Sequence, residues 1–364
     1  MLTPHMSRTL AIAVAATVLS WSPALAQAPA GHAQSAKAAA VTVGQVPLSK
    51  MPPPVCSGED MLAEIAKTDP AGHAAIMAKA AATENADARL WKIEKPGVAT
   101  PSYLFGTIHM TDDRVVKLSP VVEAALAKAK VVAVEVTGLG DAERATRAML
   151  EAADAMVFTD GRDLSKVLSA DELAAVAEVT AVSGMPPDAV RLLKPWVVSM
   201  QLATSVCEKI RVEAGVAVLD SKIEQVAQAK KIKVIGLETV KEQVSAMSKM
   251  PEADQVQHLR AGLKYRHRLD DSTATLIKLY LDRNIGAALP LQAYLASKAN
   301  VGKVSFDSFE KALLTDRNLR MRDRAKPLVD KGGAFIAVGA LHMPGKSGLV
   351  TLFRDAGYTV TRVE

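Results

Sequence analysis

The segment Tyr103-Leu-Phe-Gly-Thr-Ile-His109 joins a short apolar run to a Gly-x-x-His motif, and Ala334-Phe-Ile-Ala-Val-Gly-Ala-Leu-His342 repeats this arrangement far along the chain. Each apolar run predicts a buried strand. If the two strands are parallel neighbours, both histidines emerge at the same carboxyl edge of the sheet. Open α/β sheets bind their ligands at that edge. Two imidazoles brought together there indicate a metal site or a hydrolytic site.

Strand and helix signals around these motifs predict an α/β fold. Strands are expected at residues 89–93, 102–108, 131–136, 231–236, 334–338 and 358–363. The apolar run Val131–Val136 is typical of a strand buried on both faces of a parallel sheet. Helix starts are indicated by Ser119-Pro120 and by two capping boxes, at Ser169–Glu172 and Thr239–Glu242. Further helices are expected at residues 61–82, with a break near Pro70, and at 252–281, 306–329 and 348–356.

The order of these elements predicts a single α/β domain. It has a mixed, largely parallel central sheet and a large helical insertion at about residues 141–226 and 239–330. The domain is expected to comprise residues 56–364. Residues 27–55 are rich in Ala, Gln, Val and Pro without a sustained period, which predicts a flexible leader.

The first 26 residues have the pattern of a secretory signal peptide. Arg8 precedes an apolar stretch, and Ala24-Leu-Ala26 is a small-x-small site, so cleavage is predicted after Ala26. The apolar stretch is too short to span a bilayer, and no later segment reaches about 18 apolar residues. We therefore expect a periplasmic or secreted protein without stable membrane insertion.

Charge and cysteine content restrict the partners and the compartment. The formal net charge is +5, and loss of Arg8 with the signal peptide leaves +4. Because no Lys/Arg run accompanies this small surplus, we expect no nucleic-acid partner. Cys56 and Cys207 are the two cysteines, and in an oxidising compartment they favour a disulfide worth roughly 5 kcal/mol. Two free buried thiols are the alternative.

At four predicted strand ends a polar residue follows the apolar run: His109, Glu135, Glu238 and His342. Two imidazoles with one or two carboxylates are a suitable ligand set for Zn²⁺, Mn²⁺ or Co²⁺. Such an ion lowers the pKa of a bound water toward neutrality. The pattern therefore predicts a divalent-metal site.

Each member of this set also has a structural explanation. A single histidine at a strand end is often only structural, and Glu135 could serve an ion pair. Glu238 could favour the dipole of the helix that begins after Thr239. The motif glycines, Gly106 and Gly339, are expected to relieve crowding and to permit a backbone turn that L-residues resist.

Arg317 lies on the apolar face of the predicted helix 306–329. A buried arginine needs an anionic partner, because an unpaired buried charge is costly. The alternative is a half-covered helix whose arginines reach out to solvent. The remaining histidines of the predicted domain are expected at the surface: His73, His258 and His267.

Several of these segments resemble the TraB/PrgY/GumN family, and its GumN-like bacterial branch most of all. The matching segments are Tyr103–His109, Val134-Glu135, Gly236-Leu-Glu-Thr239, Arg317-Asn318 and Gly339-Ala-Leu-His342, with Lys194-Pro-Trp196 and Val218-Leu-Asp220. The resemblance implies a fold related to the erythromycin-esterase and ChaN-like group. Tiki members of the family are divalent-metal-dependent proteases that use the two Gly-x-x-His motifs and a glutamate. Here the corresponding residues are His109, His342 and Glu135.

The resemblance and the residues together lead us to expect an exported metal-dependent hydrolase acting on a peptide or protein. Mn²⁺, Co²⁺ or Zn²⁺ would be held by the two histidines with Glu135 or Glu238, and Glu135, Arg317 and Asn318 would be catalytic. Two alternatives remain open. One is a non-catalytic periplasmic protein that binds a peptide or a polysaccharide intermediate. The other is a metal-free hydrolase with His109 and Glu135 as acid and base.

Overall fold

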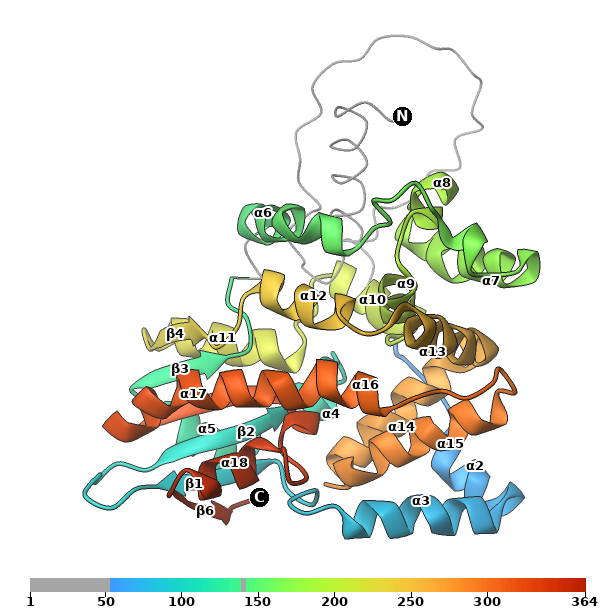
Figure 1. The fold of residues 1–364 in the computed structure, drawn as a ribbon. Helices are drawn as coiled ribbons and strands as arrows, with labels where there is room; N and C mark the ends of the chain where they lie inside the picture. The colour runs from blue at the N-terminus through green and yellow to red at the C-terminus, as the bar shows by residue number, and fades with distance from the viewer. Residues whose placement is uncertain (1–52, 139–141) are drawn as a thin grey trace.

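A six-stranded sheet with the order β4-β3-β5-β2-β1-β6 forms the centre of the computed structural model (Figure 1). The structure describes residues 53–138 and 142–364. The predicted signal peptide and most of the predicted leader lie outside the described residues. The strands are β1 (Leu90–Glu94), β2 (Ser102–Thr107), β3 (Val131–Val134), β4 (Lys233–Gly236), β5 (Ala334–Gly339) and β6 (Thr359–Arg362).

The four strands β4, β3, β5 and β2 are parallel neighbours, whereas β1 runs antiparallel to both β2 and β6. The prediction of a mixed, largely parallel sheet in one α/β domain is therefore confirmed. Strands β2 and β5 lie side by side, with Gly106 opposite Val338 and Thr107 opposite Gly339. Both Gly-x-x-His motifs consequently leave the sheet next to each other.

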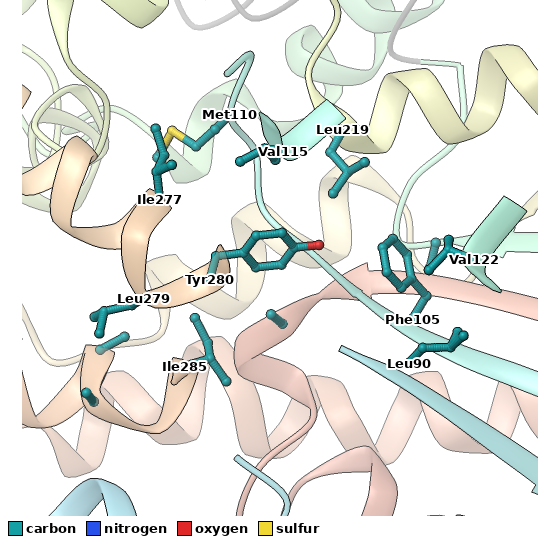
Figure 2. Close-up of a cluster of buried hydrophobic side chains, with 14 of the residues drawn as sticks. Leu90, Phe105, Met110, Val115, Val122, Leu219, Ile277, Leu279, Tyr280 and Ile285 are labelled. Carbon is teal, nitrogen blue, oxygen red and sulfur yellow. The ribbon is translucent and has the colours of Figure 1, made fainter. Parts of the chain in front are cut away.

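Helices cover both faces of the sheet because side chains alternate along each strand. In β5, Phe335 and Ala337 belong to one hydrophobic cluster, while Ile336 and Val338 belong to the other. The first face packs against α5 (Pro120–Ala127), α11 (Leu219–Ala229) and α14 (Leu269–Leu281), and Figure 2 shows this cluster. The second face packs against α17 (Asp316–Lys331) and α18 (Leu349–Asp355).

The remaining helices lie mostly beyond the carboxyl edge of the sheet (Figure 1). A separate hydrophobic cluster holds α7, α8, α9, α12 and α13 together. The bounds are α2 (Met61–Thr68), α3 (Pro70–Ala82), α4 (Asp113–Val116), α6 (Ala142–Ala152), α7 (Ala170–Thr180), α8 (Pro187–Arg191), α9 (Pro195–Gln201), α10 (Val206–Glu213), α12 (Val240–Ser248), α13 (Glu252–Lys264), α15 (Ala288–Lys298) and α16 (Asp307–Glu310). Among the described residues, no helix is long and apolar enough to cross a membrane.

Local capping explains several of these boundaries. Ser169 and Thr239 each form the capping box that the sequence predicts, at the starts of α7 and α12. Asp69 caps α3 immediately before Pro70, which accounts for the break between α2 and α3.

Two helix predictions were wrong in detail, and one helix was missed. The expected helix 252–281 is divided by a 3-10 turn at Arg266–Arg268, and helix α15 was not predicted. The expected helix 306–329 contains a π-helical turn, η8 (Lys311–Thr315), between α16 and α17.

The prediction that His258 lies at the surface was wrong. His258 is half-buried rather than exposed, because its ring stacks on Phe309 with centroids 5.0 Å apart.

Cys56 and Cys207 form a disulfide, as predicted, with their Cα atoms 5.6 Å apart. The bond joins the segment before α2 to the first turn of α10. It closes a loop with a sequence separation of 151 residues.

Candidate functional site

The two motif glycines permit close approach at the carboxyl edge of the sheet. A Cβ atom on Gly106 would lie 3.0 Å from the Cα of Ala340, and one on Gly339 would lie 3.2 Å from Oε1 of Glu135. Neither glycine has a positive φ, and that of Gly339 is −50°. The expected relief of crowding is therefore present, whereas the expected turn that L-residues resist is absent. Strands β2 and β5 bring the motifs together by side-by-side packing alone.

Glu135 follows β3 and lies between the second motif and α17. Its Oε1 accepts a hydrogen bond from the backbone N–H of Gly339 at 2.7 Å. Its Oε2 accepts from Nη2 of Arg317 at 2.6 Å and from Nε2 of Gln243 at 3.1 Å. Burial opposes ionisation, but the charges of His342 and Arg317 and the Gly339 amide lower the pKa of Glu135 to about 2. The carboxylate is thus ionised and fixed from two sides.

His342 is buried, and its tautomer follows from its neighbours. Nδ1 lies 2.6 Å from Oδ1 of Asn318, whose Nδ2 donates to the carbonyl of Ser347 at 2.8 Å. An amide oxygen only accepts, so Nδ1 of His342 must carry the proton. Burial lowers the pKa of His342 to about 4, which keeps the ring neutral at pH 7. The unprotonated Nε2 therefore faces Glu135, with 3.6 Å between it and Oε1.

His109 is held from the other side by Asp220, the second residue of α11. Its Nδ1 donates to Oδ2 of Asp220 at 2.8 Å, and Oγ1 of Thr107 donates to the other carboxylate oxygen at 2.5 Å. The negative charge of Asp220 raises the pKa of His109 to about 9, against the effect of burial, although 45% of the side chain is exposed. Carboxylate–histidine pairs of this kind fix the ring and make its second nitrogen a better ligand.

Arg317 donates hydrogen bonds to both Glu135 and Glu238. Its Nε donates to Oε2 of Glu238 at 2.8 Å, its Nη2 donates to Glu135, and its Nη1 donates to the carbonyl of Leu313 at 3.1 Å. Leu313 lies in the π-helical turn η8, and such turns occur frequently at functional sites. The structure thus supplies the anionic partners that a buried arginine requires. Its charge is held inward and does not reach out to solvent.

Glu238 has a different environment from Glu135. Its side chain is fully buried, and its Oε1 accepts from Nη1 of Arg320 at 2.6 Å while Oε2 accepts from Arg317. Both oxygens are therefore bound by guanidinium groups. Glu135 is the carboxylate beside His342, which answers the question that the sequence left open about which glutamate lies nearer the histidines.

The nitrogen and oxygen atoms of His342, Glu135 and His109 are of the types that bind a divalent metal, and part of their arrangement suits one. The 3.6 Å between Nε2 of His342 and Oε1 of Glu135 is close to the separation of two ligands on a tetrahedral ion, about 3.4 Å for bonds of about 2.1 Å. His109 is near enough for its charge to lower the pKa of Glu135. Within residues 53–138 and 142–364, however, no group of three or more His, Cys, Asp or Glu side chains is positioned to hold a metal.

The structure therefore brings Glu135, His342, Arg317 and Asn318 into direct contact, with His109 adjacent and Glu238 behind Arg317. Sequence reasoning missed Asp220 as a site residue. The signal that could have identified it is the segment Val218-Leu-Asp220, one of those that resemble the family.

Comparison with known proteins identifies one family. The sequence model of the TraB/PrgY/gumN family matches residues 89–362, a range that contains both motifs and every side chain in contact at the site. No curated protein and no solved structure shows significant similarity to the chain.

Proposed function

The chain belongs to the TraB/PrgY/gumN family, and from that premise we propose that it is a divalent-metal-dependent hydrolase that cleaves peptide bonds. The observation that carries the proposal is the tethering of both motif imidazoles through Nδ1. Asp220 holds Nδ1 of His109 and Asn318 holds Nδ1 of His342, so Nε2 would be the ligating nitrogen on each ring. Metal-binding histidines commonly have this arrangement.

His109, His342 and Oε1 of Glu135 would hold the ion after moving closer together, because the described structure does not yet position the three for it. When bound, it would supply Lewis acidity and a water of lowered pKa. Glu238, with both oxygens bound to guanidinium groups, is not part of this set. His109 must give up the proton that Asp220 stabilises before it can bind an ion, so metal affinity should rise with pH.

Arg317 is assigned to positioning. Its Nε, Nη1 and Nη2 donate to Glu238, Leu313 and Glu135. Few of its N–H groups therefore remain to bind a substrate carboxylate or an oxyanion. It fixes Oε2 of Glu135 so that Oε1 faces His342. Asn318 plays the equivalent part for His342, and neither side chain needs to touch the substrate.

A peptide substrate is proposed from family likeness, since Tiki relatives are proteases. Export to an oxidising compartment is supported by the Cys56–Cys207 disulfide, because such bonds persist outside the cytosol.

The test combines metal content with cleavage of a peptide library. We expect about one Mn²⁺, Co²⁺ or Zn²⁺ per chain, turnover that chelation abolishes, and loss of both in His109→Ala and His342→Ala. His267→Ala, an exposed histidine outside the site, serves as the matched control and should behave like the wild type. Absence of bound metal at saturating concentrations of all three ions would refute the metal-dependent mechanism.

One observation favours a second candidate, a metal-free hydrolase. His109 and Asp220 form a hydrogen-bonded pair of the kind that serves general acid–base catalysis. Turnover that survives chelation but is lost in Asp220→Asn would identify this mechanism. Saturable peptide binding without cleavage under every metal condition would identify a binding protein instead.

A further inference from the structure

The loop between β2 and α4 carries His109, and its buried anchor is Thr111. This residue is fully buried, and each of its polar groups has a partner. Its backbone N–H and its Oγ1 both donate to Oε2 of Glu208 at 2.8 Å. Oγ1 also accepts from Nε of Arg211 at 2.7 Å, and the Thr111 carbonyl accepts from Nη2 of Arg211 at 3.0 Å. Two residues of α10 therefore hold one residue of the loop through four hydrogen bonds.

The neighbouring residue Met110 is fixed from a second direction. Its side chain belongs to the hydrophobic cluster and points toward Ile277 in Figure 2, and its carbonyl accepts from the N–H of Leu219 at 3.3 Å. Leu219 immediately precedes Asp220, the partner of His109. The loop is thus tied to α10 at Thr111 and to α11 at Met110.

Helix α10 is itself anchored. Cys207, next to Glu208, is bonded to Cys56, and Nη1 of Arg211 donates to the carbonyl of Pro54 at 2.9 Å. The segment before α2 is thereby fastened to α10 twice. This connects the disulfide, through two side chains, to the loop that carries His109.

The charges on α10 are costly for a purely structural role. Glu208 is 1% exposed and Arg211 is 9% exposed, and Oε1 of Glu208 is buried without a hydrogen-bond partner in the described part of the chain. Burying ionised groups costs several kcal/mol per ion before pairing, so an apolar contact or a neutral cap would secure an ordinary loop more cheaply. Glu208 and Arg211 do not bond to each other in the described structure but meet at Thr111, and this arrangement fixes the position of the loop.

We propose that Glu208 and Arg211 are positioning residues that set the place of His109 by holding Thr111, with the Cys56–Cys207 disulfide securing the helix that carries them. The proposal rests on the proposed function, because it assigns His109 a part in catalysis. It adds α10 to the machinery of the site, although within the described residues this helix has no hydrogen bond or ion pair with the second motif or with Glu135.

The test uses Thr111→Val, which removes the hydroxyl at nearly constant volume, and Glu208→Gln, which removes the charge and keeps the shape. Thr180→Val is the matched control, because Thr180 is equally buried and its Oγ1 donates to the Val176 carbonyl within α7, away from the site. All are made in the full chain, together with the Cys56→Ser/Cys207→Ser double variant.

Two quantities are measured. The first is amide hydrogen exchange of residues 106–113, which should become at least about tenfold faster in the Thr111, Glu208 and cysteine variants and stay unchanged in Thr180→Val. The second is peptide turnover, for which kcat should fall by about 10²-fold with little change in KM, the effect of a small misplacement of a reacting group.

The outcomes separate the two proposals. Faster exchange with unchanged kcat overturns the positioning role, as does unchanged exchange in residues 106–113. If the wild type cleaves no peptide, the proposed function fails. The exchange measurement still supports or refutes the proposal that Glu208 and Arg211 hold the loop at Thr111. A parallel loss of kcat in Thr180→Val would assign the effect to general destabilisation and would also overturn the proposal.

Discussion

The Nδ1 atom of His342 lies 2.6 Å from Oδ1 of Asn318, and this contact determines which nitrogen of the buried imidazole carries its proton. Because Nδ2 of Asn318 is committed to the Ser347 carbonyl, the amide cannot reverse without losing a hydrogen bond. Asn318 on α17 therefore determines the tautomer of His342, which follows β5.

Replacing Asn318 by Leu should release this constraint. The buried Nδ1 loses its acceptor, which costs about 1–3 kcal/mol of folding stability, and the ring becomes free to place its proton on Nε2. We expect a 10–100-fold loss of metal affinity or turnover, of the order seen for outer-shell partners of metal ligands. Nitrogen NMR of the imidazole reports the tautomer directly. Asn318→Asp, which keeps an acceptor, should retain the wild-type tautomer; the same tautomer in Asn318→Leu would contradict the assignment.

The buried charge of Glu238 should matter far more than the charge of Glu242, which forms a partly exposed pair with Arg324. Glu238→Gln leaves Arg317 with Glu135 alone and Arg320 without its carboxylate partner, so we expect a loss of about 3–5 kcal/mol in urea unfolding. Glu242→Gln weakens a partly exposed pair with Arg324 and should cost less than about 1 kcal/mol. Equal losses in the two variants would show that Glu238 contributes no more than a surface pair.

Close packing at the first motif predicts the effect of Gly106→Ala. The added methyl would lie 3.0 Å from the Cα and 3.1 Å from the Cβ of Ala340. The 3-10 turn that holds Ala340 after β5 must therefore shift by a few tenths of an ångström, at a cost of about 1–3 kcal/mol measured by thermal unfolding. The double variant with Ala340→Gly should recover part of this loss, and no recovery would place the strain elsewhere.

Acid should destabilise the protein in part through Glu242. Hydrogen bonds from Arg324, and then from Thr239, lower the pKa of Glu242 from 4.5 to about 2, with burial acting against them. A carboxyl group whose pKa is lower when folded stabilises the fold above pH 4.5, and that contribution is lost as the pH falls toward 2. Glu242→Gln should therefore show a shallower fall in melting temperature between pH 5 and about 2. An unchanged slope would contradict the prediction.

The parts of this fold that follow from the sequence are those with local causes. The runs before Gly106 and Gly339 are apolar throughout because β2 and β5 are covered on both faces, and Ser169 and Thr239 carry their own capping signals. The π-helical turn before Arg317 has no such signal, because its hydrogen bonding depends on contacts with elements distant in the chain.

The residues of the site were likewise predictable only where their position has a local signal in the sequence. His109, Glu135 and His342 stand at strand ends, where their type and place are visible in the sequence. Asp220 and Glu208 lie on helices of the insertion, and no spacing rule relates them to His109. Their roles depend on how α10 and α11 pack against the loop after β2, which is tertiary information.

The position of β5 has a consequence for how the protein becomes active. Strand β5 lies between β3 and β2, although it follows both by some two hundred residues, so these early strands have no direct pairing with each other. A partly synthesised chain lacks the central strand, the second histidine and the anchor for Glu135. Contacts this distant in sequence form late in folding. The fold thus withholds any activity of the site until nearly all of the chain has been synthesised.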